Sequence, residues 1–469
     1  MLVSFAVSNF RSFAARQVFS LFASKRLGRA HESHTLPLPD SDQSVLRAGV
    51  IYGTNGSGKS NLFTALQYVR HLALAHREEP TTTRDRFQLP DLGPQPSTFD
   101  LHFIAGDKLY RFSLYLDEER IINERLAQVV EGKERPIYLR HLNSAGEVGV
   151  DAPGLRNVSE KLQGVIQAGS RDNQTFLATV RGMLNRGYIG RTLTEVIEWF
   201  DGGLALVGPE ATLDLSVQRL ARDGEFCQFA SEFLKASATG VDHMRVDRTE
   251  LSKEEARALL LRETRRLELE RDNERPFSVR RAPNRSELLV ERNSDGEHFY
   301  SVAIQAAHKT ALRGEGTLPL SQESDGTKRL LDLIPALYQL QPGKAVYFID
   351  EIDRSLHPLL VYKYLEYFLS ACTGSPCQII VTTHETHLLD LNLLRRDEIW
   401  FAEKDSSAAT RLYSLTEFNV RKDLQVRKAY LGGRFGAVPP LGGIDQMRAR
   451  RAGGTSRRRE ELSSAHRRS

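Results

Sequence analysis

The chain has 469 residues, of which 40% are hydrophobic and 26% are charged, the balance of an ordinary globular protein large enough for two or three domains. The sequence holds no run of the roughly 20 apolar residues that a membrane-spanning helix needs, and its first residues lack the basic and apolar regions of a signal peptide. The three cysteines, Cys227, Cys372 and Cys377, are scattered, which excludes a disulfide framework and a cysteine-ligated metal site and favours buried apolar roles. We therefore expect a cytoplasmic protein that does not enter a membrane.

Positive charge gathers at the C-terminal end. The net charge is +4 for the whole chain, whereas residues 441–469 contain eight arginines and three acidic residues, which gives +5 for this segment and −1 for the rest. The near-neutral body argues against a broad nucleic-acid-binding surface. The segment lacks apolar periodicity, so we expect a disordered basic tail that either contacts nucleic acid or has no specific role.

The first 150 residues predict strands around one helix. Residues 1–13 predict a strand that runs into the sequence Asn9-Phe10-Arg11-Ser12-Phe13, and residues 50–52 predict a short buried strand before a glycine-rich turn. An amphipathic helix follows, with apolar side chains spaced from Leu62 to Ala73. The remaining predictions are loops over 26–45 and 77–97 and antiparallel strands over 99–124.

Beyond residue 150, a helical region gives way to alternating strands and helices. We expect residues 155–310 to be mostly helical, with helices at Gln174–Leu184, Thr192–Phe200, Ser216–Lys235 and Lys253–Asp272. The last of these mixes both charges along its faces and is either a solvated helix or a short projecting arm. In the final third, apolar strands at 345–350, 378–383 and 397–404 alternate with helices at 328–340, 359–371 and after His387. Buried strands separated by helices indicate a parallel sheet covered on both faces.

The strongest motif is a glycine-rich phosphate-binding loop, Gly53-Thr54-Asn55-Gly56-Ser57-Gly58-Lys59-Ser60. Backbone N–H groups of such a loop, and of the helix that follows it, bind phosphate oxygens. We expect Lys59 to neutralise the β- and γ-phosphates and the Ser60 hydroxyl to bind Mg²⁺. The motif follows a predicted strand and opens a predicted helix, which is the context it requires. The sequence therefore predicts a site for ATP and Mg²⁺.

Two carboxylates follow the apolar strand Ala345–Ile349. This is the Walker B arrangement, in which Asp350 holds the Mg²⁺, through water, and Glu351 orients the attacking water as general base. The next predicted strand delivers His384 at its carboxyl end, where ligands of open α/β sheets bind. His384 either senses the γ-phosphate or is an ordinary polar residue at a strand end.

A second phosphate-binding device lies at Ser324-Asp325-Gly326, just before the helix predicted over Lys328–Leu340, which Pro335 kinks. A simple N-capping serine is the alternative interpretation and is compatible with that role.

Taken in order, NFRSF, GTNGSGKS, Ser-x-Gly, FIDEID and TTH resemble the ABC-type ATPase heads of the SMC and RecF families. The resemblance implies that Ser324 and Gly326 complete the ATP site of an opposite subunit. It also implies that Asp353 belongs to the D-loop, and the segment Ser355–Pro358 matches this region in the OLD and RecF branches. The Q-loop glutamine is left open between Gln88, the first choice, and Gln95.

A narrower resemblance, to RloA-like ATPases of the OLD family, rests on the order of ESDGTKRLLDL, DEIDRSLHP, TTHETHLLD and the segment Tyr430–Pro439. Such proteins are similar to the AriA ATPase of the PARIS anti-phage system. The resemblance implies a prokaryotic anti-phage role beside a separately encoded effector, with a nucleic acid or a phage protein as trigger. Only 68 residues follow Phe401, too few for the Toprim nuclease domain of OLD proteins, so we expect any such nuclease on another chain.

We therefore predict an α/β protein, an ABC-ATPase head (a P-loop NTPase) with mixed and parallel sheet and a mainly helical insertion. The predicted function is ATP hydrolysis by a homodimer or higher homo-oligomer that gates an effector. A RecF-like ATPase that binds duplex DNA in DNA maintenance is the alternative, and an ABC transporter ATPase is a third. The expected domains are 1–150 with the P-loop and antiparallel strands, 151–310 as the insertion, 311–440 with the signature, Walker B and His384, and 441–469 as the tail.

Overall fold

The structure is a computed structural model of the full chain. It describes residues 1–28, 31–75, 81–89, 93, 95–143, 145–156, 158–210, 214–252, 254–255, 277–281, 287–292, 299–310, 314–338, 345–371, 376–419 and 425–438. The predicted basic tail, Cys372 and all but two residues of the predicted charged helix lie outside these ranges.

A six-stranded sheet forms the centre of the fold, and all but one of its neighbouring strand pairs are parallel. Its order is β11 (Leu204–Val207), β17 (Val346–Ile349), β18 (Gln378–Thr383), β5 (Ala48–Tyr52), β19 (Ile399–Lys404) and the antiparallel edge strand β20 (Thr410–Ser414). These strands are runs of apolar, mostly buried residues, as expected for a sheet that is covered on both faces. The predicted α/β class with a mixed, largely parallel sheet is confirmed.

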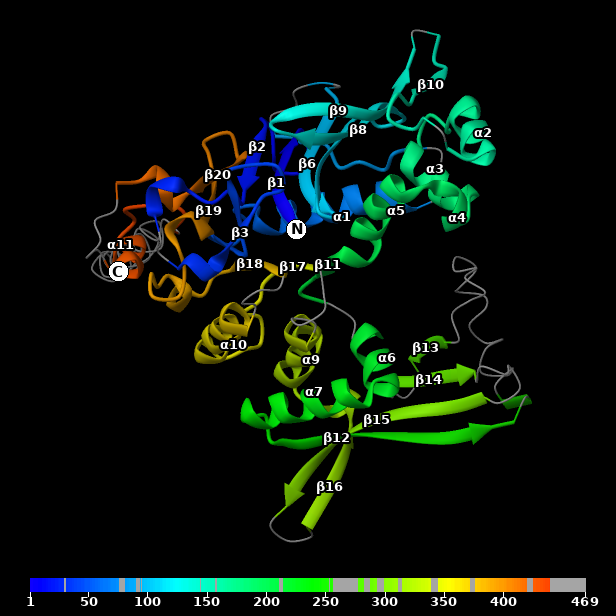
Figure 1. Cartoon of the computed structure of the whole chain (residues 1–469). Coiled ribbons are helices and arrows are strands. Elements are labelled where there is room, and N and C mark those ends of the chain that lie inside the picture. The colour runs from blue at the N-terminus through cyan, green and yellow to red at the C-terminus, as the bar shows by residue number, and fades with distance from the viewer. Residues whose placement is uncertain are drawn as a thin grey trace, which may run out of the picture.

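Helices pack on both faces of this sheet (Figure 1). One face packs against α1 (Lys59–Leu74), since Leu62 and Phe63 share a core with Ile51 and Phe348. The other face packs against α9 (Asp325–Tyr338) and α10 (Pro358–Ala371). No helix in the described ranges is long and apolar enough to cross a membrane.

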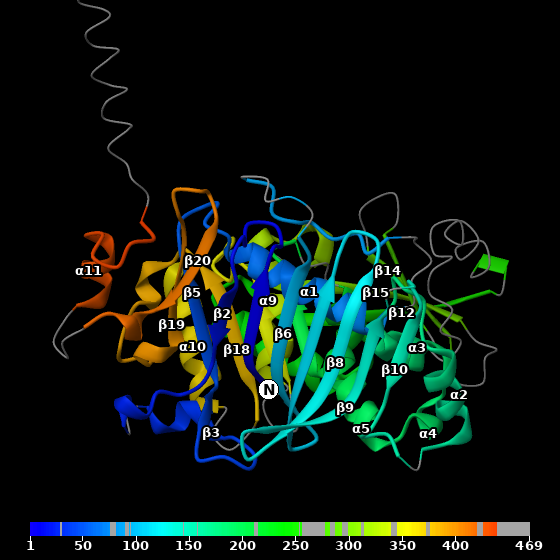
Figure 2. The same ribbon diagram turned by 90° about the horizontal axis from the view of Figure 1, so that it is seen from above.

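A seven-stranded antiparallel sheet covers the far side of α1 (Figure 2). Its order is β10 (Val148–Asp151), β9 (Lys133–Leu142), β8 (Ile121–Val130), β7 (Lys108–Leu116), β6 (Ser97–Ala105), β1 (Leu2–Ser8) and β2 (Gln17–Ser20). The antiparallel strands predicted over 99–124 are confirmed. The predicted loop over 26–45 also contains a short hairpin, β3 (Thr35–Pro37) and β4 (Ser44–Leu46).

Residues 160–203 and 214–236, on either side of the strand β11, are mostly helical, as predicted. They form α2 (Glu160–Ala168), α3 (Phe176–Met183), α4 (Arg186–Ile189), α5 (Arg191–Glu198), a π-helical turn (Trp199–Gly203), α6 (Asp214–Arg222) and α7 (Gly224–Ala236). The single helix predicted over Ser216–Lys235 is two helices. Asp223 leaves the helical conformation and its carboxylate accepts a hydrogen bond from the backbone of Phe226, capping α7.

The helical prediction is wrong beyond Ala236. A second antiparallel sheet is formed by β12 (Val241–Leu251), β13 (Phe277–Arg281), β14 (Glu287–Arg292), β15 (Phe299–Thr310) and β16 (Gly314–Pro319). The signal was the two-residue alternation of Val302, Ile304 and Ala306, which are buried against α6 and α7. The predicted helix after His387 is also absent, and a short 3₁₀ turn, Thr386–Leu388, stands there.

The region that the sequence predicts as an insertion also completes the central sheet. Its strand β11 pairs in parallel with β17, from Leu204 opposite Val346 to Val207 opposite Ile349. This pairing joins residues about 140 positions apart in the sequence. The region is therefore not a simple appendage to the rest of the fold.

Candidate nucleotide-binding site

The P-loop connects β5 to α1 and is shaped by glycines that admit no side chain. Gly58 precedes α1 with a φ of 104°, and a Cβ there would lie 2.1 Å from Thr410 Oγ1. A Cβ on Gly53 would lie 2.4 Å from the Ala402 carbonyl oxygen. Gly56 also has a positive φ, of 77°, but nothing lies within 4 Å of its Cβ position. The loop is thus packed at both ends and open at Gly56, which, like Asn55, is exposed.

Ser12 and Thr410, which the sequence did not single out for this site, hold the P-loop in place through hydrogen bonds. Asn61 Nδ2 donates to Ser12 Oγ (2.7 Å), Ser12 and Thr410 share a hydroxyl–hydroxyl bond (2.8 Å), and Thr410 Oγ1 donates to the Ser57 carbonyl oxygen (2.8 Å). A carbonyl oxygen can only accept, so Thr410 gives its proton to Ser57 and accepts from Ser12. The turn after β1 and the edge strand β20 therefore fix the loop.

Lys59 is a buried cation, with 4% of its surface exposed. Its Nζ donates to the carbonyl oxygens of Gly53 (2.8 Å) and Thr54 (3.1 Å) and lies 3.3 Å from His384 Nε2. Burial lowers the pKa of Lys59 to about 8, although the charges of Asp350 and two other carboxylates raise it. In the described part of the chain no carboxylate lies within ion-pair distance of this ammonium group. A buried cation without a counterion is suited to an anionic ligand.

One hydroxyl positions both Walker B residues. The Thr382 hydroxyl, at the end of β18, donates to Asp350 Oδ1 (2.5 Å) and accepts from the backbone N–H of Glu351 (2.8 Å). Asp350 is 2% exposed, whereas Glu351 is half-buried and has a φ of 49°. The left-handed conformation is rare for such a residue and turns the chain sharply after β17.

Asp353 and His384 lie beside these groups. The backbone N–H of His384 points to Asp353 Oδ2 at 3.4 Å, and Asp353 Oδ1 is buried without a partner among the described residues. Partial burial of the ring and the nearby Lys59 ammonium lower the pKa of His384. The structure thus brings together Lys59, Asp350, Glu351, Asp353 and His384.

The arrangement suits magnesium bound together with a phosphate ligand. Ser60, on the first turn of α1, is half-buried, and Asp350 lies at the end of a strand in the same sheet. Within the described ranges no group of three or more His, Cys, Asp or Glu side chains can hold a metal ion. Mg²⁺ usually binds through one or two protein ligands, substrate phosphates and water, so Ser60 and Asp350 fit that pattern.

Ser324 and Gly326 lie elsewhere in the same subunit. The Ser324 hydroxyl accepts from the backbone N–H of Thr327 (3.1 Å), which caps α9, and its side chain is exposed. A Cβ on Gly326 would lie 2.9 Å from the Ser355 carbonyl oxygen. In the described part of the chain no hydrogen bond joins Ser324 to the P-loop. The capping role is confirmed, and a role toward another subunit stays a prediction.

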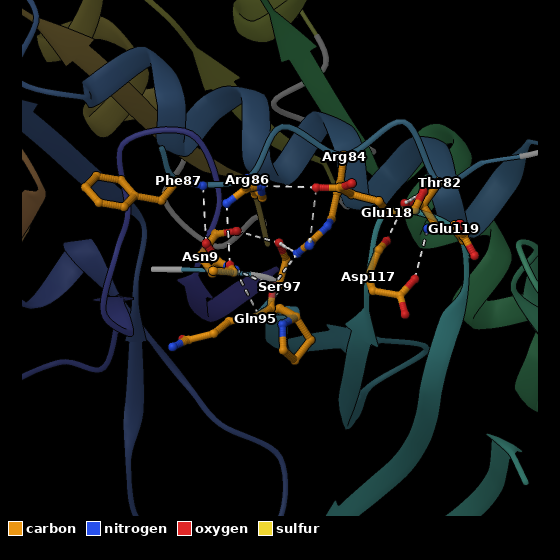
Figure 3. Close-up of polar contacts among 12 residues, drawn as sticks. Asn9, Thr82, Arg84, Arg86, Phe87, Gln95, Ser97, Asp117, Glu118 and Glu119 are labelled. Carbon is orange, nitrogen blue, oxygen red and sulfur yellow. Dashed lines mark hydrogen bonds and ion pairs between the residues drawn. The ribbon is translucent and has the colours of Figure 1, made fainter. Parts of the chain in front are cut away.

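The two Q-loop candidates, Gln88 and Gln95, are exposed. Asn9 is hydrogen-bonded to Gln95 and to Phe87, the residue before Gln88 (Figure 3). Asn9 Nδ2 donates to the Gln95 carbonyl oxygen (2.5 Å), and Asn9 Oδ1 accepts from the Phe87 backbone (3.2 Å). Arg84 Nη1 also donates to the Gln95 carbonyl oxygen (2.9 Å). These bonds use the backbone of Gln95, so they do not decide between Gln88 and Gln95.

The chain was compared with protein families, with curated proteins and with solved structures. Residues 50–159 and 183–390, more than half of the chain, match the family model described as "AAA domain, putative AbiEii toxin, Type IV TA system". No curated protein matches the sequence. Similar solved structures include the SMC head bound to the C-winged helix domain of ScpA (12% identity, TM-score 0.38, 88% of this chain and 97% of that one). They also include the SMC head domain from Thermotoga maritima (13% identity, TM-score 0.36, 89% and 99%).

Proposed function

We propose that the chain is an ABC-type ATPase which pairs on ATP and gates a separately encoded effector in prokaryotic anti-phage defence. The premise is that the chain belongs to the family described as "AAA domain, putative AbiEii toxin, Type IV TA system" and has a P-loop NTPase fold. One observation carries the ATPase assignment. Three neighbouring strands of one sheet, β17, β18 and β5, lead at their carboxyl ends into the segments that carry Asp350 and Glu351, His384, and Lys59.

The P-loop supplies the binding half of the site. Lys59 would exchange its bonds to the Gly53 and Thr54 carbonyl oxygens for phosphate oxygens, and the N-terminus of α1 adds backbone donors. Ser60 and Asp350 would hold Mg²⁺, which when bound neutralises charge that develops on the phosphates. The open position at Gly56 leaves room for the backbone to approach a phosphate closely.

The Walker B loop supplies the chemical half. The Thr382 hydroxyl holds the N–H of Glu351, and the carboxylate of this half-buried residue stays free to orient a water molecule and accept its proton. Burial and the Lys59 ammonium lower the pKa of His384, which favours the neutral ring in the protein without nucleotide, so we propose that His384 acts as a hydrogen-bonding group near the transferred phosphate.

Pairing is proposed because Ser324 is exposed and, among the described residues, makes no hydrogen bond to the P-loop of its own subunit. Ser324 is exposed at the N-terminus of α9, a helix of 14 residues whose partial positive charge favours an anion. A second copy would place its bound ATP against this end. The region over 155–310, much of which extends from the ATPase sheets in Figure 1, would then serve as the surface for the effector or the trigger.

The proposal is tested with purified protein and with phage challenge. The protein should hydrolyse ATP with Mg²⁺ and should sediment as a dimer or larger species only with ATP. Cells that express the chain with the product of its adjacent gene should survive phage infection, and Lys59→Ala should abolish both survival and ATP binding. ATP turnover that needs duplex DNA, together with no protection against phage, would instead favour DNA maintenance and overturn the effector-gating proposal.

A further inference from the structure

Arg329 is a buried arginine in the second turn of α9, with 5% of its surface exposed. Its guanidinium donates three hydrogen bonds, all to main-chain carbonyl oxygens. Nη1 donates to Gly208 (2.7 Å), and Nη2 donates to Asp350 (2.7 Å) and Glu351 (3.1 Å). A single side chain of α9, the helix that follows Ser324, is thus hydrogen-bonded both to the Walker B loop and to the segment after β11.

These bonds offset the cost of a buried cation. Burial lowers the pKa of Arg329, because the charged form loses its hydration. The planar guanidinium fork can reach several carbonyl oxygens at once, which a lysine ammonium on a flexible stem cannot do from the same position. The residue type is therefore specific to this bridging arrangement.

The bridged segment is the one that carries the proposed general base. Glu351 has a φ of 49°, a conformation that costs free energy in a non-glycine residue and persists only where its surroundings enforce it. Thr382 holds its N–H and Arg329 holds its carbonyl oxygen, so the residue is fixed from both sides. The backbone N–H of Asp350 also donates to the Val207 carbonyl oxygen (2.9 Å), which ties the loop to β11.

The same helix begins at the exposed signature. Gly326 packs so closely that a Cβ would lie 2.9 Å from the Ser355 carbonyl oxygen, five positions after Asp350. The start of α9 therefore contacts the loop 350–355 at two points, through Gly326 and through Arg329. A displacement of the Ser324 end must move this loop, because closely packed contacts transmit small shifts.

We propose that Arg329 is a positioning residue that couples the signature end of α9 to the orientation of Glu351, so that hydrolysis is switched on when a second copy engages Ser324 and Gly326. The inference rests on the proposed paired ATPase and adds the route by which pairing reaches the general base. It predicts that loss of the guanidinium separates ATP binding and pairing, which persist, from hydrolysis, which fails.

Arg329→Lys and Arg329→Met test this coupling. The KM for ATP and the ATP-dependent sedimentation should stay close to the parental values, whereas kcat should fall on the order of 10²-fold, as when a catalytic group is misplaced by about 1 Å. Hydrogen exchange of the backbone around Gly208 and Glu351 should accelerate without nucleotide in both variants. The lysine variant should lie between the parent and the methionine variant.

Arg140→Lys is the matched control. Arg140 is also fully buried and donates to main-chain carbonyl oxygens, those of Ile121, Arg171 and Asp172, but it lies in the antiparallel sheet. This variant should lose thermal stability without a selective loss of kcat.

The inference is overturned if folded Arg329→Lys and Arg329→Met pair and hydrolyse ATP at the parental kcat, or if both lose pairing itself. A parental protein that neither pairs nor hydrolyses ATP would instead overturn the proposed function, and unchanged exchange near Glu351 would overturn the positioning role separately.

Discussion

Ser12 and Thr410 lie 398 positions apart in the sequence and share a hydrogen bond of 2.8 Å beneath the P-loop. The bond continues on one side to Asn61 in α1 and on the other to the Ser57 carbonyl oxygen. The first turn of the chain and a late edge strand therefore set the shape of the phosphate-binding loop together. This relationship makes Thr410 part of the candidate nucleotide site, through the shape of the loop.

Thr410→Val should weaken ATP binding through this contact. Valine keeps the shape of threonine but leaves the Ser57 carbonyl oxygen without its donor, which costs about 1–3 kcal/mol for a buried group. We expect a lower melting temperature and a higher Kd for ATP, measured by thermal unfolding and calorimetry. Thr410→Ser keeps the hydroxyl and should bind ATP nearly as the parent does. Equal affinity of the valine variant and the parent would show that the contact does not shape the loop.

The parts of the site that the sequence predicts are those encoded in short segments. Gly53–Ser60 and Asp350–Glu351 each follow an apolar strand, so their place at one sheet edge follows from local pattern and sheet topology. Ser12, Thr382 and Arg329 lie within the motifs NFRSF, TTH and ESDGTKRLLDL, but these motifs do not show which partners the three side chains bond to. Tertiary pairing is not visible in composition.

The missed sheet over 241–319 has a different cause. The strand β12 is charged along much of its length: Arg245, Arg248 and Glu250 are exposed, and Val241 and Met244 are its buried residues. A half-exposed strand with many charges resembles a solvated helix when only hydrophobic content is considered. The two-residue period in β15 was the discriminating signal.

ATP affinity should fall as the pH rises above about 8. Burial lowers the pKa of Lys59 to about 8, so the free protein loses this positive charge above that pH, whereas bound phosphates favour the charged form. Affinity should therefore be flat below pH 8 and fall by up to about tenfold per pH unit above it. Calorimetry at pH 8.5 in buffers of different ionisation enthalpy should show proton uptake on binding. His384→Ala should retain this uptake, and a parent that binds ATP without it would contradict the assignment to Lys59.

Glu351→Gln should bind ATP and fail to hydrolyse it. Glutamine keeps the length of the side chain, and the backbone bond to Thr382 is unaffected, but an amide cannot accept the proton of the attacking water. We expect turnover to fall by about 10²–10⁴-fold, as is typical when a general base is removed. Phosphate release measures the rate, and equilibrium binding of ATP is the control. Hydrolysis at the parental rate would place the base elsewhere.

Ser324→Arg tests whether the ATP site is shared between two copies. The substitution puts a bulky cation at the exposed end of α9 and leaves the P-loop of the same subunit intact, so ATP should still bind to single subunits while pairing and hydrolysis fail. Ser324→Ala is the matched control, because it removes the cap of α9, at a cost of about 0.5–2 kcal/mol, without adding bulk.

Mixing Ser324→Arg with Lys59→Ala makes the test decisive. A mixed dimer has one site that carries both defects and one site with an intact Lys59 and an intact Ser324, so mixing should restore part of the hydrolysis that each variant lacks alone. Subunit exchange is first verified with labelled protein. A shared site is excluded if Ser324→Arg alone hydrolyses ATP at the parental rate, since each subunit would then complete its own site. A mixture that exchanges subunits and stays inactive means either that both sites must hydrolyse together or that the site is not shared. Sedimentation with ATP separates these outcomes, because only the first retains ATP-dependent mixed dimers.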